Sequence, residues 1–322
     1  MTRRVLVRNP ESGDREAGER AVAMARERGY EIRTTEEAGD EVRMAREAAT
    51  DGADAVVACG GDGTVNGVVR GVLGAGRLDE VALGVVPAGT GNDFAENVGV
   101  ADVEAGLDAV DAGETRRIDL GIVEAPGAGA DESAAAAGGD ATRRPFLNSC
   151  VGGLTAEAGA RPESSLKQRM GVLAYVLTTL QHTRSFEGLE LTVRAGEERD
   201  PVWSGEAVLL VVGNARNLPG QPANVEDGEL DVVVVERAPA TDFLAAGAVD
   251  RVFGGETPYL SRFRTPSLVV EAGRPRQFSL DGELLKRRRI AATTLERSVT
   301  FAVGEGYEPP PDWHPSGGDG PD

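Results

Sequence analysis

Short apolar runs alternate with amphipathic segments over the first third of the chain. In the segments between the runs, apolar side chains recur every three or four positions, which predicts helices over residues 14–28, 37–49 and 64–73. The apolar runs themselves predict strands over residues 5–7, 30–33, 54–59 and 81–86. Because strands alternating with helices of this length form βαβ units, we expect an α/β domain with a parallel sheet over residues 1–120.

The pattern becomes β-rich after residue 120. Short apolar runs separated by Gly and Pro predict a sandwich-like second domain over residues 121–289, interrupted by helices at 166–181 and 240–253. We expect residues 290–306 to complete the first domain. Segment 125–144 is Ala, Gly and Asp of low complexity and predicts a surface insertion, and residues 307–322 predict a flexible tail. The expected strands are 115–123, 146–151, 189–193, 207–213, 230–235, 267–271, 277–280 and 299–303.

Composition excludes several classes of protein. The chain carries 53 Asp and Glu against 34 Lys and Arg, a net charge of −19, so it lacks the basic face that nucleic-acid binding requires. Cys59 and Cys150 are too few for a disulfide framework or a thiolate metal site. No apolar run approaches the ~20 residues of a transmembrane helix. We expect a cytoplasmic protein with no transmembrane segment, whose membrane contact is peripheral.

The basic residues are almost all arginine, since Lys167 and Lys286 are the two lysines. Surplus carboxylates with few lysines are typical of halophilic archaeal proteins, because concentrated salt screens dense negative charge. An acidic protein from a GC-rich genome would have the same bias, and the sequence leaves both origins open.

Three turns join a predicted strand to a following helix. Residues 60–64 read Gly-Gly-Asp-Gly-Thr, residues 87–95 contain a second Gly-X-Gly turn, and residues 9–13 form the third. Such turns present backbone N–H groups and a helix N-terminus to an anion. Asp62 would repel a bare phosphate, which indicates either a nearby divalent cation or hydrogen bonds to the loop itself. In the second turn, Thr90 or Asn92 can cap the next helix.

The carboxyl ends of parallel strands share one edge of a sheet, so the three turns are expected to converge there. This convergence favours a nucleotide cleft over three unrelated turns. The cleft is neither a P-loop nor a dinucleotide fingerprint, because the Gly-Lys-Ser/Thr and G-x-G-x-x-G patterns are absent from the sequence.

Together with two later motifs, these segments resemble the diacylglycerol-kinase catalytic-domain family, which includes soluble bacterial and archaeal lipid kinases and the sphingosine and ceramide kinases. The motifs, in order, are segments 9–13, 60–64, 87–95, 118–121 and 280–283. The resemblance implies a first domain similar to NAD kinases and phosphofructokinases, with the active site in the cleft between the domains. It also implies ATP and Mg²⁺ as cofactors and a lipid substrate at the membrane surface. The nucleotide-binding residues it implies are Asn9, Pro10, Ser12, Gly13, Gly60, Gly61, Asp62, Gly63, Thr64, Asn66, Gly89, Thr90, Asn92 and Asp93.

The resemblance also implies catalytic and metal residues in the second half of the chain. It assigns Asp281 as the general base for the lipid hydroxyl, with Glu283 close by, whereas the residues alone read Asp281-Gly282 as a hairpin turn. A structural Mg²⁺ site is implied at Asn224, Asp227 and Glu229.

The chain departs from the family pattern at two places. Gly67 stands where members usually carry an acidic residue, and segment 152–159 lacks their Gly-Phe-Asp pattern. The leading hypothesis is an ATP-dependent kinase of a diacylglycerol-like or archaeal dialkylglycerol or isoprenoid lipid. The alternatives are a kinase of a soluble substrate such as NAD and a nucleotide-binding regulatory protein without catalysis. The basic run 286–289 is a candidate for membrane contact, and a homodimer is left open.

Overall fold

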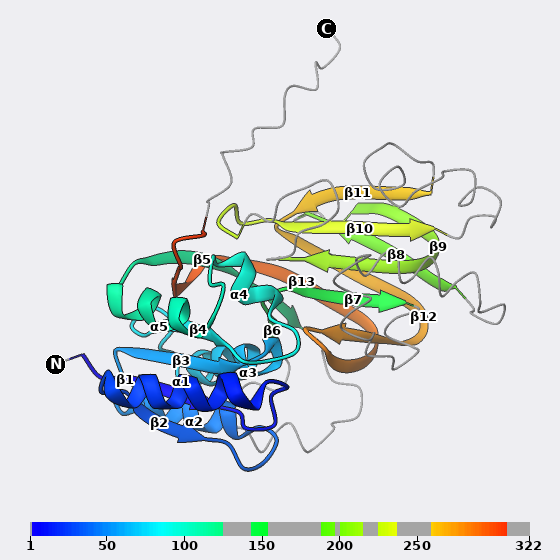
Figure 1. Cartoon of the computed structure of the whole chain (residues 1–322). Coiled ribbons are helices and arrows are strands. Elements are labelled where there is room, and N and C mark those ends of the chain that lie inside the picture. Colours follow the sequence, from blue (N-terminus) through cyan, green and yellow to red (C-terminus); the bar gives the residue numbers. More distant parts are fainter. Residues whose placement is uncertain are drawn as a thin grey trace, which may run out of the picture.

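The computed structural model describes residues 2–124, 143–153, 188–196, 200–214, 225–236 and 259–307. The strands of its first half, β1 to β4, pair in parallel in the order β4–β3–β1–β2 (Figure 1). Their elements are β1 (Arg4–Arg8), α1 (Arg15–Glu27), β2 (Glu31–Thr34), α2 (Asp40–Thr50), β3 (Ala55–Gly60), α3 (Asp62–Gly74), β4 (Ala82–Pro87), α4 (Asp93–Asn97) and α5 (Val103–Ala112).

Apolar side chains fill both faces of this parallel sheet, as its continuous buried strands require. Alternation along β1 sends Val5 and Val7 to the core shared with α2, α3 and α4, and Leu6 to the core shared with α1 and α5. Both faces are therefore covered by helices, and the polar groups available for chemistry lie at the sheet edge where the strands end.

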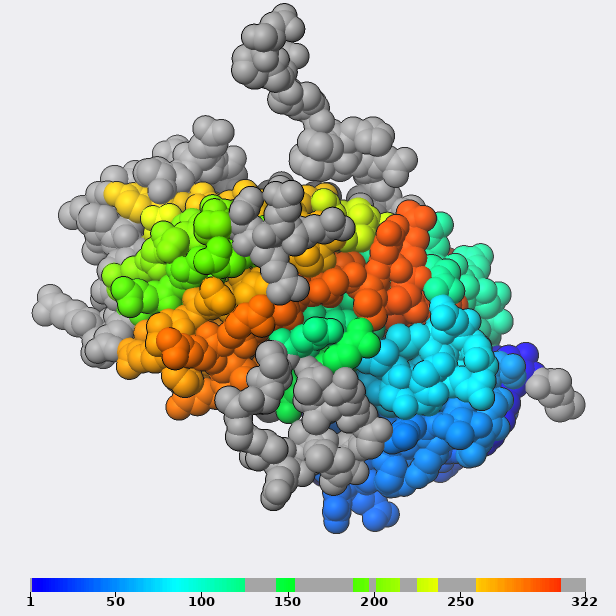
Figure 2. All heavy atoms as spheres, turned by 180° about the vertical axis from the view of Figure 1, so that it is seen from behind, coloured from blue at the N-terminus to red at the C-terminus, as the bar shows by residue number. Residues whose placement is uncertain are grey.

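The second half of the described chain is antiparallel and joins the first through β13, which pairs with β4 at Phe301 and Leu83. The long strands β9 and β12 each pair with both β7 and β8 at different points along their length (Figure 1). Seen from behind, β12 and β13 run across the molecule to the first half (Figure 2). The strands are β5 (Thr115–Glu124), β6 (Arg143–Phe146), β7 (Ser149–Gly153), β8 (Leu189–Ala195), β9 (Asp200–Gly213), β10 (Leu230–Glu236), β11 (Leu260–Thr265), β12 (Ser267–Leu280) and β13 (Glu283–Ala302).

Several predicted boundaries are wrong. The runs 267–271 and 277–280 belong to one strand, β12, whose pairing register shifts between Glu271 and Arg276, and the run 299–303 is the end of the 20-residue β13. Strand β11 was not predicted, and the run 146–151 is split between β6 and β7. Arg143 and Arg144, placed in the insertion, begin β6 instead. Charged residues on the exposed side of β13 hid its length, because periodicity identifies apolar faces.

The predicted helices 166–181 and 240–253, the insertion up to residue 142 and the tail beyond Tyr307 lie outside the described residues. Among the described helices, none combines the length and the apolar character needed to cross a membrane.

Candidate active site

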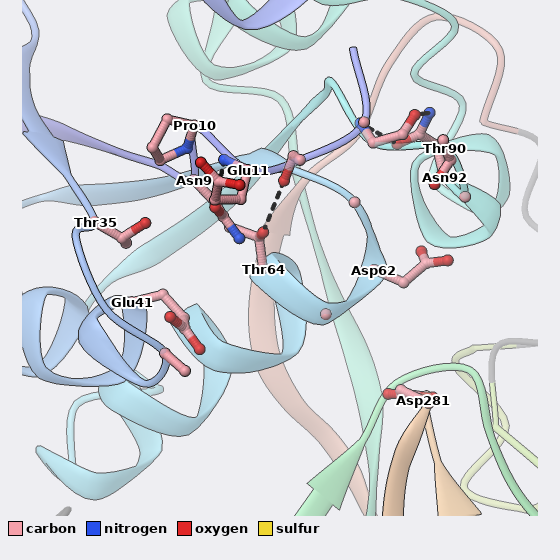
Figure 3. A pocket seen from close by; sticks show the side chains of 18 of the residues that line it. Asn9, Pro10, Glu11, Thr35, Glu41, Asp62, Thr64, Thr90, Asn92 and Asp281 are labelled. Carbon is pink, nitrogen blue, oxygen red and sulfur yellow. Dashed lines mark hydrogen bonds between the residues drawn. The ribbon is translucent and has the colours of Figure 1, made fainter. Parts of the chain in front are cut away.

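A pocket of about 1370 Å³ lies where the parallel strands end, and the turn between β12 and β13 forms its far wall. It exceeds the 300–1,000 Å³ typical of small-molecule sites, so a nucleotide leaves room for part of a second substrate. In Figure 3, Asn9, Pro10 and Thr35 lie on one side and Asp281 on the other, with Thr64 and Asp62 between them. The expected site residues that line it are Asn9, Pro10, Ser12, Gly13, Gly61, Asp62, Gly63, Thr64, Gly89, Thr90, Asn92, Asp93, Asp281 and Glu283.

The two glycine turns touch backbone to backbone. A Cβ on Gly89 would lie 2.3 Å from Cα of Gly61, and a Cβ on Gly61 would lie 2.9 Å from the carbonyl oxygen of Gly91. The Asp62 N–H donates to that same carbonyl at 3.3 Å. Glycine is therefore required for the close approach of the two turns, and this packing keeps side chains out of the floor of the pocket.

Gly60 and Asn66, both expected in the site, lie behind the pocket wall. A Cβ on Gly60 would lie 2.4 Å from Oγ1 of Thr64 and 2.8 Å from Oγ of Ser12, so a larger residue would push these hydroxyls from their places. The two hydroxyl oxygens are themselves 3.5 Å apart (Figure 3). Gly60 thus leaves room for the Ser12 and Thr64 side chains, which line the pocket.

Helix α3 begins at Asp62, two residues earlier than predicted, with Gly61 as its N-cap. Gly61 offers no side-chain acceptor for the first N–H groups of the helix. The N-terminus of an α-helix carries a partial positive charge, and N–H groups there that have no backbone partner donate readily to an anion. The N–H groups of Asp62 and Thr64 are already paired with backbone carbonyls. The 13-residue α3 therefore directs the positive end of its dipole at the pocket.

Asp62 makes hydrogen bonds to the neighbouring turn, which is one of the two alternatives that the sequence left open. Its Oδ1 accepts the N–H of Phe94 at 3.0 Å and its Oδ2 accepts the N–H of Asp93 at 3.3 Å, so Asp62 caps α4 from a neighbouring turn. Burial raises the pKa of Asp62 to about 6. Asn92 occupies the N-cap position of α4 as expected, but its side chain does not cap the helix, because it binds the backbone N–H and carbonyl of Gly89 instead.

Asp281 forms the hairpin turn and also lines the pocket. Leu280 pairs with Glu283 across the two-residue turn Asp281-Gly282, whose φ values of 46° and 99° identify a type I′ hairpin. The side chain of Asp281 nevertheless projects to the pocket, where backbone N–H groups between β6 and β7 hold it. The turn thus positions the carboxylate.

Four N–H groups donate to the Asp281 carboxylate. Oδ1 accepts from Asn148 at 3.0 Å and Ser149 at 2.9 Å, and Oδ2 accepts from Leu147 at 2.6 Å and the Asn66 side chain at 3.0 Å. Burial raises the pKa of Asp281, and these donors oppose the rise. Each oxygen has two lone-pair directions, so a substrate hydroxyl reaches Asp281 only if one donor moves aside.

Asn66 is the donor best suited to move, because it is the one side chain among the four. Its Nδ2 also donates to the carbonyl oxygen of Pro145 at 3.0 Å, so one amide group links α3 to β6 and to the hairpin turn. Nearby, Glu283 pairs with Arg70 at 2.8 Å and lies 3.8 Å from Arg144. Arg70 and Arg144 are the cations that contact Glu283 among the described residues.

The expected metal residues that the structure describes, Asp227 and Glu229, lie beside an arginine. Arg264 on β11 places NH1 3.0 Å from Oδ2 of Asp227 and 4.0 Å from Glu229, and its Nε donates to Asp231 at 2.7 Å. Oδ2 of Asp227 is buried and has no hydrogen-bond partner among the described residues, and the Arg264 guanidinium supplies positive charge beside it. The described residues contain no group of three or more His, Cys, Asp and Glu able to hold a metal, and Asn224 lies outside them.

Thr35 and Glu41 line the pocket, although neither was predicted there. Thr35 is buried and its N–H donates to the carbonyl oxygen of Arg8 at 2.9 Å, just after β2 ends. The sheet-edge argument covered three strands and omitted β2, which ends at the same edge. Applying it to the fourth strand would have found Thr35.

Two family models cover most of the chain. The diacylglycerol kinase catalytic domain matches residues 3–123, and the YegS C-terminal NAD kinase beta sandwich-like domain matches residues 148–300. A probable lipid kinase YegS-like protein of Pseudomonas aeruginosa (strain UCBPP-PA14) is 34% identical over 300 residues, 89% of each chain. The chain belongs to the diacylglycerol kinase catalytic domain family.

Other relatives agree with this membership. A diacylglycerol kinase of Bacillus subtilis (strain 168) is 29% identical and covers 88% of this chain and 90% of its own. The crystal structure of a putative diacylglycerol kinase from Bacillus anthracis str. Sterne has a TM-score of 0.71 at 21% identity, covering 95% of this chain and 97% of its own, and shows the shared fold. The expected two-domain architecture and phosphotransferase class are thereby confirmed.

Proposed function

We propose that this protein is an ATP-dependent lipid kinase that transfers the γ-phosphoryl group of MgATP to a hydroxyl of a diacylglycerol-like lipid. The observation that carries the proposal is the single pocket that joins the glycine turns and the end of α3 to the carboxylate of Asp281. The names of the relatives support a lipid acceptor. A dialkylglycerol or isoprenoid alcohol presents the same hydroxyl and belongs to the same proposal.

The phosphates of the nucleotide would lie against backbone N–H groups of the glycine turns and the N-terminus of α3. This arrangement suits a chain of net charge −19 with two lysines, because it needs no cationic side chain at the phosphates. Mg²⁺ would arrive with ATP as part of the substrate and neutralise charge on the phosphates. The protein's own contribution is alignment of the two reactants and electrostatic stabilisation.

Asp281 would accept the proton of the acceptor hydroxyl. The hydroxyl oxygen forms its bond to the γ-phosphorus while the bond from that phosphorus to the β-γ bridging oxygen breaks, and ADP leaves with the electron pair. The Asn66 amide turns from Oδ2 to admit the hydroxyl, and the three backbone donors keep the carboxylate oriented. Arg70 and Arg144 beside Glu283 are placed to balance the charge of the phosphorylated product.

Peripheral membrane contact would occur at the start of β13. Leu284 is 51% exposed, and Lys286 and Arg288 alternate with it on the same exposed side of the strand, within six residues of the turn. An apolar side chain flanked by basic ones suits an anionic bilayer surface. The surface lies next to Asp281, so a lipid hydroxyl at the interface would have a short path to the pocket.

A transfer assay with radiolabelled ATP tests the proposal. Wild type is incubated with a panel of diacylglycerol, dialkylglycerol, isoprenoid alcohol and, as the soluble alternative, NAD. Label in the lipid extract supports the proposal. Label in NAD would replace it with the soluble-substrate kinase, and calorimetric binding of ATP without transfer to any acceptor would favour a regulatory protein.

A further inference from the structure

Glu41 and Gly67 occupy one shared space between α2 and α3. The side chain of Glu41, in the first turn of α2, lies over the backbone of Gly67, and a Cβ on Gly67 would lie 2.1 Å from its Cγ and 3.0 Å from its Cδ and Oε1. Any other residue at position 67 would therefore displace Glu41.

The two helices pack closely beside this position, so a side chain at position 67 would meet the Glu41 side chain directly. One turn further along α3, a Cβ on Gly71 would lie 2.4 Å from the carbonyl oxygen of Val42 and 2.7 Å from Cβ of Ala45. The backbones of α2 and α3 are thus in direct contact through Gly71. The position of the Glu41 side chain depends on the glycine at position 67.

This arrangement places the Glu41 carboxylate in the wall of the pocket. Glu41 is half-buried and lines the pocket with Asn9, Thr35 and Thr64. Figure 3 shows it on the Thr35 side of Thr64, away from Asp281. It is therefore at the end of the pocket opposite the proposed acceptor.

A carboxylate at this place has a restricted choice of ligand. An ionised carboxylate is an acceptor only, and it repels phosphate oxygens, so its partner in the pocket must donate a hydrogen bond. With the phosphates at the glycine turns and the γ-phosphate toward Asp281, the nucleoside occupies the Thr35 end. The ribose hydroxyls lie closer to the phosphates than the adenine amino group does, so they are the nearest donors that ATP brings there.

We propose that Glu41 accepts a hydrogen bond from a ribose hydroxyl of the bound nucleotide, and that Gly67 is glycine because this places Glu41 correctly. Glu41 then selects ribonucleotides over deoxyribonucleotides. The proposal rests on the proposed function, because it requires that the pocket bind ATP with the γ-phosphate toward Asp281, and it holds for any acceptor.

Calorimetry with ATP, 2′-deoxy-ATP and 3′-deoxy-ATP tests the contact by binding alone. In wild type, at least one deoxy nucleotide should bind about tenfold or more weakly than ATP, the loss of one hydrogen bond to a charged acceptor. Glu41→Ala should bring that ratio close to one, and Glu41→Gln, which keeps an acceptor oxygen, should give an intermediate ratio. Glu37→Gln removes an equal charge from the exposed rim and should keep the wild-type ratio.

A double-variant cycle tests the role of Gly67. Gly67→Ala should lower the ratio as Glu41→Ala does, and adding Gly67→Ala to Glu41→Ala should change nothing further. Alanine is the better helix former, so thermal unfolding should show a folded Gly67→Ala protein. A merely structural role for Gly67 predicts instead that the two substitutions act independently.

The outcomes separate this proposal from the proposed function. Equal binding of all three nucleotides by wild type, or an unchanged ratio in Glu41→Ala, overturns the ribose contact while ATP binding stands. A protein that binds no ATP loses both proposals.

Discussion

Replacement of Arg264 by Met tests whether an arginine supplies the positive charge at the loop where the family resemblance implies a metal. Arg264 is 18% exposed and its partner Asp231 is 6% exposed, so the substitution leaves a nearly buried carboxylate without its counter-charge. Breaking a buried pair costs about 3–5 kcal/mol, and we reduce this to about 2–4 kcal/mol because the arginine is partly exposed. Met keeps the length and most of the packing of the arginine stem.

The assay is thermal unfolding in excess magnesium chloride and in EDTA. The Arg264→Met protein should unfold roughly 5–10 °C below wild type, and the melting temperature of wild type should change by less than about 1 °C between the two solutions. Arg194→Met is the matched control, because the Arg194–Glu271 pair is exposed at 38% and 44% and is worth about 0–1 kcal/mol. A wild type that EDTA destabilises, with Arg264→Met no worse than the control, would refute the reasoning.

Three further predictions concern pH, the base and the membrane. Burial raises the pKa of Asp62 and of Asp119 to about 6. The stability that their protonation contributes is therefore full below the unfolded pKa of 3.8 and is lost as pH rises through 6. The melting temperature should be higher at pH 5 than at pH 7.5, and a lower value at pH 5 would contradict this. Asn66→Ala removes a donor that lowers the pKa of Asp281, so the acid limb of the pH profile of kcat/KM should move to higher pH, and an unmoved limb would exclude Asp281 as the titrating base. Substituting glutamine for the basic residues of run 286–289 should reduce activity on anionic vesicles more than on detergent-dispersed lipid, and equal loss would count against docking there.

The convergence of the three glycine and asparagine turns could be predicted because it follows from chain order. Parallel strands end at one edge of the sheet, and each turn follows such a strand. The strand and helix pattern of the sequence is therefore enough to predict that the turns lie together. The Asp281-Gly282 hairpin was equally local, since the dipeptide itself favours a type I′ turn.

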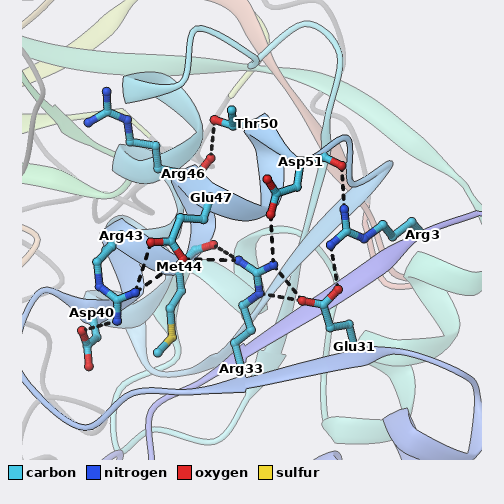
Figure 4. A network of polar contacts seen from close by, with 10 residues as sticks. All are labelled: Arg3, Glu31, Arg33, Asp40, Arg43, Met44, Arg46, Glu47, Thr50 and Asp51. Carbon is cyan, nitrogen blue, oxygen red and sulfur yellow. Dashed lines mark hydrogen bonds and ion pairs between the residues drawn. The ribbon is translucent and has the colours of Figure 1, made fainter.

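Contacts between distant segments could not be read from the sequence. The four donors of Asp281 come from positions 132 to 215 residues away, and the partner of Asp227 is an arginine on a strand that periodicity did not reveal. Surface ion pairs are also partly non-local: Arg33 contacts Glu47 on α2 and Asp51 at the end of that helix, besides Glu31 on its own strand (Figure 4). In the sequence, Gly67 stands where members of the family usually carry an acidic residue. The structure places the carboxylate of Glu41, from another helix, over that same position.

The most direct test of the central claim is transfer of label from γ-labelled ATP into extracted lipid by wild type and by Asp281→Asn. The asparagine turns an NH₂ group toward two of the four donors, so thermal unfolding must first confirm that the variant is folded at the assay temperature. The account predicts transfer by wild type, at least about a hundredfold slower transfer by the folded variant, and retained binding of ATP. Full transfer by folded Asp281→Asn, or no transfer by wild type to any lipid hydroxyl, would contradict it.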